Sequence, residues 1–287
     1  MSDGRSLGRR AYLKAVGAGS AVALAGCLTG GGGGDGGGGN GTGNGSGNDT
    51  GNATDGGGGG GEIVAGTAPG FPPFEIMKGG ELTGFDIELL EAVVAETNYE
   101  LTGWKTFDFK SLIPALNDGA IDVIAAAMTI NEERKQSIAF TNPYYEADQS
   151  ILVAKGSDFS PSKLGDLSGH PIGAQKGTTG EQIIKDQLIK PGKLDPSNYK
   201  AYDNYVLAVT DLENGNIDAV VLDKPVAQTF QQQRDVKIAF TYKTGEVYGF
   251  GARKDADPLV QALNQGLKAV KENGTYEELR NKWFSEA

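Results

Sequence analysis

The chain has 287 residues, a formal net charge of −11 and a single cysteine. This acidic balance makes nucleic acid and anionic lipid unfavourable partners, because both carry negative charge. A single cysteine excludes a disulfide bond within the chain. The residues after position 61 are numerous enough to form two lobes of ordinary domain size.

The first 28 residues have the pattern of an export signal. Four basic residues precede a short apolar run, Ala15–Leu28, which is too short and too rich in glycine and alanine to span a bilayer: Arg5, Arg9, Arg10 and Lys14. Leu24-Ala25-Gly26-Cys27 resembles the lipobox of prokaryotic lipoproteins. The resemblance implies that residues 1–26 are removed and that Cys27 is lipidated. The alternative is a chance run of small residues with an inert thiol.

The segment Gly8–Lys14 resembles a twin-arginine export signal, because Arg9 and Arg10 are followed by an aromatic residue, leucine and lysine. The alternative is an ordinary basic region of a signal peptide. Either signal places the mature chain outside the cytoplasm.

Residues 27–61 are expected to be a disordered tether. Twenty of the 45 glycines lie between residues 30 and 61, and Ala53 is the one apolar side chain there, so nothing can be buried to offset chain entropy. Four glycosylation sequons begin at Asn40, Asn44, Asn48 and Asn52, and they are either modified or a chance result of this composition. An acidic chain with such a tether also suits a haloarchaeon.

Residues 62–287 alternate between short apolar runs and helical patterns. Strands are expected at 63–65, 99–102, 121–124, 171–174, 217–222 and 236–240. Helices are expected at 85–98, 109–117, 181–188, 205–213, 226–232, 258–271 and 276–284. This alternation predicts an α/β protein with mainly parallel sheets.

Two segments of the chain repeat one pattern. Residues 116–123 and 212–219 each read as the end of a helix, a glycine and a strand that opens with isoleucine and aspartate. Two similar units favour a bilobed molecule with a cleft. Ligands of α/β sheets bind beyond the carboxyl ends of strands, here near residues 125–131 and near Asp223.

Nine short motifs then occur in order along residues 62–287. They are 71–75 (FPPFE), 82–87 (LTGFDI), 112–116 (LIPAL), 119–123 (GAIDV), 128–134 (MTINEER), 140–145 (FTNPYY), 176–179 (KGTT), 221–225 (VLDKP) and 272–276 (ENGTY). Together they resemble the polar amino acid-binding proteins of ABC importers, extracytoplasmic solute-binding protein family 3. The resemblance implies a two-lobed periplasmic-binding-protein fold of type II, the Venus flytrap, with two crossover segments near 149–155 and 245–252. Lobe 1 would comprise residues 62–150 and 248–287, and lobe 2 residues 151–247.

A free amino acid carries an ammonium and a carboxylate, so a site that buries it needs one cation and one anion. Arg134 is the candidate cation, because a guanidinium can hold a carboxylate with two parallel hydrogen bonds. The alternative is a surface arginine paired with Glu132 or Glu133. Asp223 is the candidate anion at the end of an apolar strand, and it could also cap the helix that follows. In the family these two positions bind the ligand's charged groups.

The resemblance implies further binding residues. The Thr129 hydroxyl and the Ala127 carbonyl would accept hydrogen bonds from the ammonium, and the Thr179 backbone would donate to the carboxylate. Phe71 and Phe109 would form walls for the side chain, and Gln175 would line the side of lobe 2. Ala68 and Ala126 replace an acid and a hydroxyl of some relatives. They predict a pocket that is poor in negative charge and prefers a neutral or acidic amino acid.

The sequence thus predicts a monomeric binding protein that captures a polar amino acid and delivers it to an ABC transporter permease. It would be anchored to the outer face of the cell membrane through lipidated Cys27, with no cofactor, no metal and no enzymatic activity. Two alternatives remain: a cyclohexadienyl dehydratase on the same fold, with Glu75 or Glu181 as its general acid, and a sensor input domain.

Overall fold

The computed structural model describes residues 60–284. The expected signal peptide, Cys27 and nearly all of the expected tether lie outside the described residues. No helix between residues 60 and 284 is long and apolar enough to cross a membrane.

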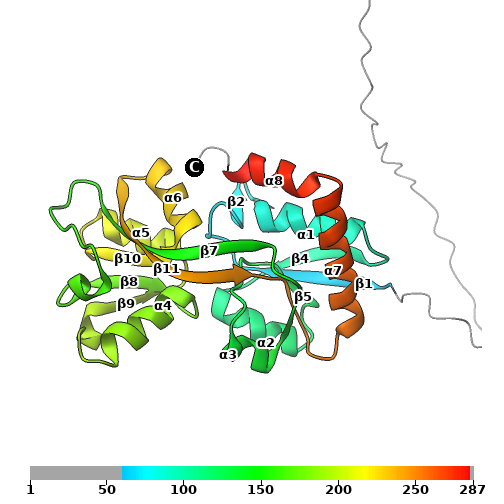
Figure 1. Ribbon diagram of the computed structural model, residues 1–287, viewed down its shortest axis with the longest axis horizontal. Coiled ribbons are helices and arrows are strands. Elements are labelled where there is room, and N and C mark those ends of the chain that lie inside the picture. Colours follow the sequence, from blue (N-terminus) through cyan, green and yellow to red (C-terminus); the bar gives the residue numbers. More distant parts are fainter. Residues whose placement is uncertain (1–59, 285–287) are drawn as a thin grey trace, which may run out of the picture. The chain divides into compact units, whose positions relative to one another are not determined.

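The first lobe is built on a five-stranded sheet with the order β4-β1-β5-β12-β6. Its strands are β1 (Glu62–Thr67), β4 (Glu100–Thr106), β5 (Val123–Ile124), β6 (Ala139–Phe140) and β12 (Gly251–Ala252). β1 pairs in parallel with β4 and β5, whereas β12 is antiparallel to β5 and β6. The helices of this lobe are α1 (Phe85–Ala95), α2 (Leu112–Asn117), α3 (Glu132–Ser137), α7 (Asp257–Glu272) and α8 (Thr275–Phe284). A hairpin of β2 (Ile76–Lys78) and β3 (Glu81–Thr83) lies beside them (Figure 1).

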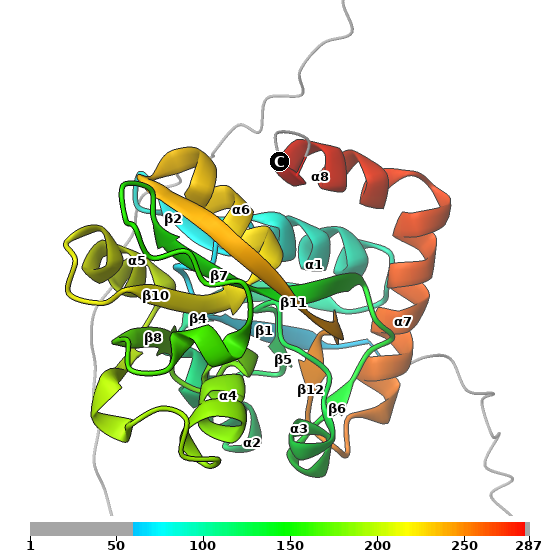
Figure 2. The same ribbon diagram turned by 60° about the vertical axis from the view of Figure 1, so that its left-hand side comes forward.

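The second lobe is built on another five-stranded sheet, with the order β11-β7-β10-β8-β9. Its strands are β7 (Tyr145–Ala154), β8 (Ile172–Gln175), β9 (Tyr199–Tyr202), β10 (Ala219–Asp223) and β11 (Val236–Tyr248). Its helices are α4 (Thr179–Ile183), which continues as a π-helix over Ile184–Ile189, α5 (Tyr205–Glu213) and α6 (Lys224–Gln233). Figure 2 shows these helices on the second lobe and α1, α7 and α8 together on the first. The predicted two-lobed α/β fold is confirmed. The expectation of mainly parallel sheets is wrong, because both sheets are mixed: β12 and β7 each pair antiparallel with two neighbours, whereas β1 and β8 pair in parallel with theirs.

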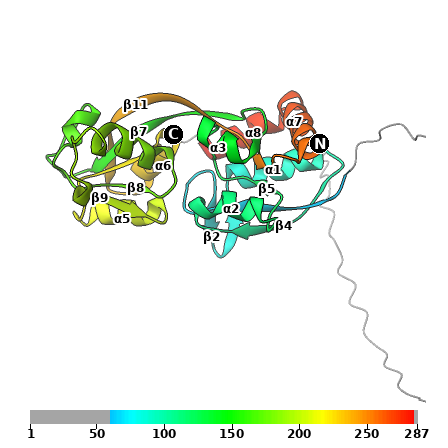
Figure 3. The ribbon, with the colours of Figure 1, turned by 90° about the horizontal axis from the view of Figure 1, so that it is seen from below.

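Two antiparallel strands, β7 and β11, connect the lobes side by side (Figure 3). Residues 141–144 lead from β6 into β7, and residues 249–250 lead from β11 into β12. The expected second crossover, 245–252, agrees with this path. The expected first crossover, 149–155, is wrong: residues 149–152 pair with β10 inside the second sheet. The apolar run Ile151-Leu152-Val153 is fully buried there, so it forms a central strand instead of a connection.

Most expected elements are present with shifted ends. The helix at 205–213 agrees with α5, whereas the helix expected from residue 181 begins at Thr179, because the Thr178 hydroxyl caps it by accepting from the Glu181 backbone N–H. β11 continues eight residues beyond the expected strand, since it forms the connection between the lobes. The repeated pattern is also confirmed, because Gly119 and Gly215 both have positive φ, 73° and 71°, between a helix and a strand.

A cluster of aromatic rings fills the base of the two connecting strands. Phe74 lies 5.0 Å from Tyr145 and 5.4 Å from Tyr248 between ring centroids, and the two tyrosine rings stack at 5.8 Å. Phe85 of α1 and Phe284 of α8 pack on the same cluster. The first lobe is thereby fixed to the connecting strands through a contiguous set of aromatic ring contacts.

Gly266 permits the close packing of α7 on α1. A Cβ atom at this position would lie 2.3 Å from the Val93 carbonyl oxygen. We expect Gly266→Ala to destabilise the protein by about 1–3 kcal/mol, although alanine favours helix, because the two helices must move apart. The melting temperature should fall by about 2–4 °C per kcal/mol. The neighbouring Gln265→Ala, on the exposed face of α7, is the control and should leave the melting temperature unchanged. An unchanged melting temperature in Gly266→Ala would contradict this account of the contact.

Candidate functional site

The structure brings all eight predicted ligand-binding residues to one small cavity between the lobes. The cavity is lined by Phe71, Glu75, Phe109, Ala127, Thr129, Arg134, Gln175, Thr178, Thr179 and Asp223. Glu75 and Thr178 are additions to the predicted set. The cavity lies beyond the carboxyl ends of β5 and β10, as the sheet topology leads one to expect. Ligand binding by these residues stays a prediction, but their convergence from both lobes is an observed property of the fold.

Arg134 is held in the site by the short helix α3. The Asn131 side chain caps this helix by accepting from the Arg134 backbone N–H at 2.8 Å. Arg134 is only 9% exposed, and its guanidinium donates to the carbonyl oxygens of Thr129 at 2.7 Å and Gly177 at 2.9 Å. It lies 5.2 Å from the centroid of the Phe109 ring. The alternative of a surface arginine is therefore wrong, and the exposed neighbour Lys135 pairs with Glu132 instead.

Burial lowers the pKa of Arg134, and the nearby Asp223 and Glu246 carboxylates counteract this effect. An arginine remains protonated under such a shift, since its ordinary pKa lies far above neutrality. The group is thus a permanent buried cation, aimed at the cavity and suited to an anionic ligand group.

Asp223 ends β10 and is 4% exposed. Burial, followed by the repulsion of Glu246, raises its pKa to about 8, while hydrogen bonds from Tyr248 and Gln149 act in the opposite direction. The Tyr248 hydroxyl donates to it at 2.6 Å. Asp223 occupies the N-cap position of α6 but makes no side-chain capping bond there, so its carboxylate is not used as a helix cap.

Two acceptor oxygens at the cavity have no hydrogen-bond partner among residues 60–284: Oε2 of Glu75 and Oε1 of Gln175. Glu75 is 1% exposed, and its pKa is raised well above the ordinary value by burial first and by Asp86 and Asp223 next. Unpartnered buried acceptors are unfavourable, and a ligand with several N–H groups would satisfy both.

The expectation of a cavity poor in negative charge is therefore wrong. It relied on Ala68 and Ala126, which pack in the apolar core of the first lobe and do not line the cavity. Glu75 supplies a carboxylate from the following turn. Glu181 does not line the cavity, because its side chain accepts from the Gly177 backbone and the Tyr199 hydroxyl.

Sequence reasoning missed Glu246, which lies in β11 and is 8% exposed. Its carboxylate accepts from the Thr129 hydroxyl at 2.8 Å and from the Gln149 side chain at 2.7 Å. The Thr129 hydrogen is thereby committed to Glu246, so the Thr129 oxygen is left to accept from other groups, including Thr179 at 3.1 Å. No sequence signal marked this pairing, because Thr129 and Glu246 are 117 residues apart.

The open space among the lining residues is about 10 Å³, room for roughly one water molecule. Direct hydrogen bonds span the cavity, from Thr129 to Thr179 and from Arg134 to Gly177. The lobes are thus closed on each other, and a ligand of amino acid size requires them to move apart. Among residues 60–284, no group of three or more His, Cys, Asp or Glu side chains is placed to hold a metal ion.

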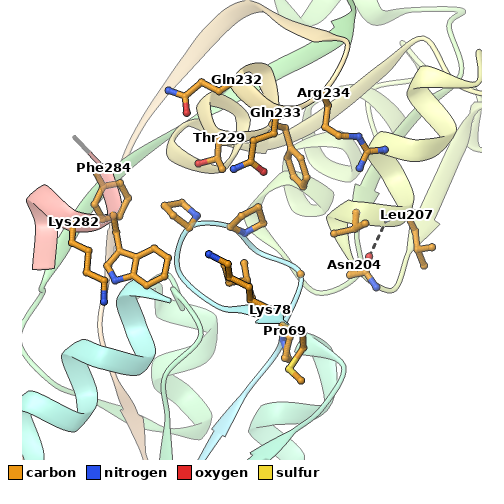
Figure 4. Close-up of a pocket in the computed structure, with 18 residues that line it drawn as sticks. Pro69, Lys78, Asn204, Leu207, Thr229, Gln232, Gln233, Arg234, Lys282 and Phe284 are labelled. Carbon is orange, nitrogen blue, oxygen red and sulfur yellow. Dashed lines mark hydrogen bonds between the residues drawn. The ribbon is translucent and has the colours of Figure 1, made fainter. Parts of the chain in front are cut away.

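A second cavity, of about 670 Å³, lies apart from the eight predicted binding residues, between the 69–78 loop and helices α5, α6 and α8 (Figure 4). All three exposed large apolar side chains of the described residues line it: Met77, Val206 and Leu207. Figure 4 shows Pro69 and Lys78 on one wall and Asn204 and Leu207 on the other. The same lining also contains three cationic side chains: Lys78, Arg234 and Lys282.

Comparison with known proteins agrees with this architecture. A probable histidine-binding protein of Campylobacter jejuni is 34% identical over 224 residues, which cover 77% of this chain and 84% of that protein. ABC transporter arginine-binding protein 1 of Escherichia coli is 33% identical over 230 residues, which cover 78% and 90% of the two chains.

The structure of an ancestral arginine-binding protein bound to arginine superposes with a TM-score of 0.73 at 40% identity, and the match covers 78% of this chain and 98% of that chain. The family model described as bacterial extracellular solute-binding proteins, family 3, matches residues 63–286. The chain therefore belongs to the bacterial extracellular solute-binding proteins of family 3.

Proposed function

We propose that this protein captures a free cationic amino acid, of which arginine fits best, and delivers it to the permease of an ABC transporter. The observation that carries the choice of ligand is the pair of unpartnered acceptor oxygens on Glu75 and Gln175 at the cavity. A guanidinium presents five N–H donors in one plane and can satisfy both. Relatives named for binding arginine and histidine support this ligand class.

Each charge of the ligand then meets a group of opposite charge or a free acceptor. The α-carboxylate lies against Arg134, and the backbone N–H of Thr179 approaches it from the second lobe. The α-ammonium lies against Asp223, the Ala127 carbonyl and the Thr129 oxygen. The side chain runs toward Glu75 and Gln175, between the rings of Phe71 and Phe109. All these groups line the cavity, and none requires a cofactor or a metal.

This proposal replaces the preference for a neutral or acidic amino acid. That preference assumed that a buried cationic side chain would lack a partner, and Glu75 removes the assumption. A glutamate ligand would instead place its side-chain carboxylate beside Glu75, and two carboxyl groups in one buried site cannot both ionise without strong repulsion.

The first test concerns the two groups assigned to the charged ends of the ligand. Removing one partner of a buried charge pair costs about 2–5 kcal/mol, a loss of roughly 30-fold to several thousand-fold in affinity. Arg134→Ala and Asp223→Ala should each nearly abolish arginine binding in calorimetry. Lys135→Ala is the matched control on α3, since its side chain is exposed and pairs with Glu132. Unaltered affinity in either variant would remove that residue from the site.

The second test concerns selectivity. Glu75→Gln keeps the size of the side chain and removes the carboxylate, so arginine should bind at least about tenfold more weakly, while glutamine should lose little or gain. The exposed Glu81→Gln changes the net charge equally and serves as the control. The two ligands are titrated into each variant by calorimetry. An equal loss for arginine and glutamine would mean that Glu75 does not contact the side chain.

A cyclohexadienyl dehydratase remains the second candidate function, because Glu75 is a buried carboxyl group at the cavity with a raised pKa, as a general acid requires. Incubation with prephenate and arogenate distinguishes the two functions. A binding protein returns both compounds unchanged, whereas the enzyme converts them at a rate that Glu75→Gln lowers.

For location, we propose a monomer held at the outer face of the cell membrane. The basis is sequence alone: a twin-arginine pattern at 8–14, a lipobox that ends at Cys27, and a glycine-rich tether over 27–61. The lobe boundaries expected from the sequence, 62–150 with 248–287 for lobe 1 and 151–247 for lobe 2, would divide β7 after residue 150, although residues 149–152 of this strand pair with β10 in the second sheet. A haloarchaeal source would account for the acidic composition.

Anchoring is predicted to depend on Cys27, since it is the only thiol and follows Leu24-Ala25-Gly26. Cys27→Ser should release the protein into the medium or stop its processing, as cell fractionation and the mass of the N-terminus would report. Ser46→Ala, in the expected tether, is a control that should stay with the membrane. Membrane association of Cys27→Ser equal to that of the unaltered chain would contradict the lipobox.

A further inference from the structure

A buried carboxylate that does not line the cavity is bonded to a residue that does. Asp86 lies in the first turn of α1 and is 0% exposed. Its Oδ2 atom accepts from the Ala127 backbone N–H at 2.6 Å and from the Tyr144 hydroxyl at 2.6 Å. Its Oδ1 atom has no hydrogen-bond partner among residues 60–284. Asp86 therefore reaches from a helix of the first lobe to the backbone at the edge of the cavity.

Ala127 has an unusual backbone conformation. Its φ is +43°, and it is the one residue other than glycine with positive φ between residues 60 and 284. This conformation costs an L-amino acid with a Cβ atom about 1–2 kcal/mol, so it persists only where surrounding contacts hold it. The hydrogen bond to Asp86 is such a contact, because it fixes the direction of the Ala127 N–H.

The other side of Ala127 faces the cavity. Ala127 lines the cavity, and no hydrogen bond within the described part of the chain uses its carbonyl oxygen. An inward N–H and an unpaired carbonyl are the arrangement that leaves an acceptor free for a ligand. Asp223 lines the same cavity and supplies the negative charge for an ammonium.

We propose that Asp86 is a positioning residue for recognition of the ligand's α-ammonium. It holds Ala127 at positive φ, and this conformation directs the Ala127 carbonyl toward the ammonium. Asp86 does not touch the ligand. The inference rests on the proposed function, since it assumes that an amino acid binds at this cavity.

The role needs an acceptor atom and not a charge. Burial raises the pKa of Asp86 to about 7, although the hydrogen bonds from Tyr144 and Ala127 lower it. One oxygen accepts both bonds, and an asparagine can present one oxygen in the same place. Asp86→Asn should therefore rescue the effect of removing the side chain.

A purely structural role of Asp86 is separable from this one. Tyr144 lies directly before β7 and stacks on Phe250 at 4.6 Å, so its bond to Asp86 could simply brace the connection between the lobes. Tyr144→Phe removes that bond and leaves the bond to Ala127, which makes it the matched control.

The experiment compares two probes by calorimetry: arginine and 5-guanidinopentanoate, which is arginine without its α-amino group. Asp86→Ala should weaken arginine binding by about 10- to 100-fold, as expected for one hydrogen bond to a charged group. It should weaken binding of the analogue by less than about threefold. Asp86→Asn and Tyr144→Phe should both keep the ratio of the two affinities near that of the unaltered protein.

Three results would overturn the proposal: unchanged arginine affinity in Asp86→Ala, an equal loss for both probes, or the same change of ratio in Tyr144→Phe. If Asp86→Ala does not fold, Asp86→Leu fills the space without an acceptor and is measured in its place. Failure of the unaltered protein to bind arginine would contradict the proposed ligand and not Asp86. The same comparison then uses the tightest-binding amino acid of the twenty and its des-amino form.

Discussion

One buried guanidinium stands among more carboxylates than it can neutralise. Arg134 faces Asp223 and Glu246, and Glu75 lies at the same cavity. Burying an unpaired charge is costly. Burial therefore raises the pKa values of Asp223 and Glu75 and favours the neutral forms of both carboxyl groups. A ligand with two positive groups and one negative group reverses the balance. The site thus holds one cation among several carboxyl groups, an arrangement that the proposed cationic amino acid would complement.

The fold concentrates these groups through its two crossing strands. β7 supplies Gln149, and β11 supplies Glu246 and Tyr248. The strands that connect the lobes therefore also carry side chains of the hydrogen-bond network at the site. The aromatic cluster around Phe74 holds the base of these strands against α1 and α8. A change in the angle between the lobes therefore moves Glu246 and Tyr248, which are bonded to Thr129 and Asp223. Movement of the lobes is thus coupled to the hydrogen bonds within the site.

The sequence predicts the position of those site residues that are marked by the residues next to them in the chain. Arg134 follows a capping asparagine and Asp223 ends an apolar strand, so the order of residues alone places both beyond strand ends. It does not reveal the role of β7, because the crossover at 149–155 rested on the family resemblance alone, and only the pairing with β10 places residues 149–152 inside the second sheet. It names Glu75 only as a general acid of the alternative function and not among the ligand-binding residues, because the direction of a side chain in a turn depends on contacts with Phe71 that no periodicity encodes. The bond from Asp86 to Ala127 spans 41 residues and leaves no local pattern either.

Closure of the lobes depends on few polar contacts at the site. The bonds from Arg134 to Gly177 and from Thr129 to Thr179 are ordinary hydrogen bonds, each worth about 0.5–1.5 kcal/mol net, or somewhat more for the charged donor. Such contacts let the lobes separate and admit a ligand. The guanidinium has five N–H groups and uses two of them here, so three remain for a ligand carboxylate. A ligand carboxylate could therefore add bonds to Arg134 without breaking its bond to Gly177 of the second lobe, so in the proposed complex one side chain would hold the ligand and link the two lobes.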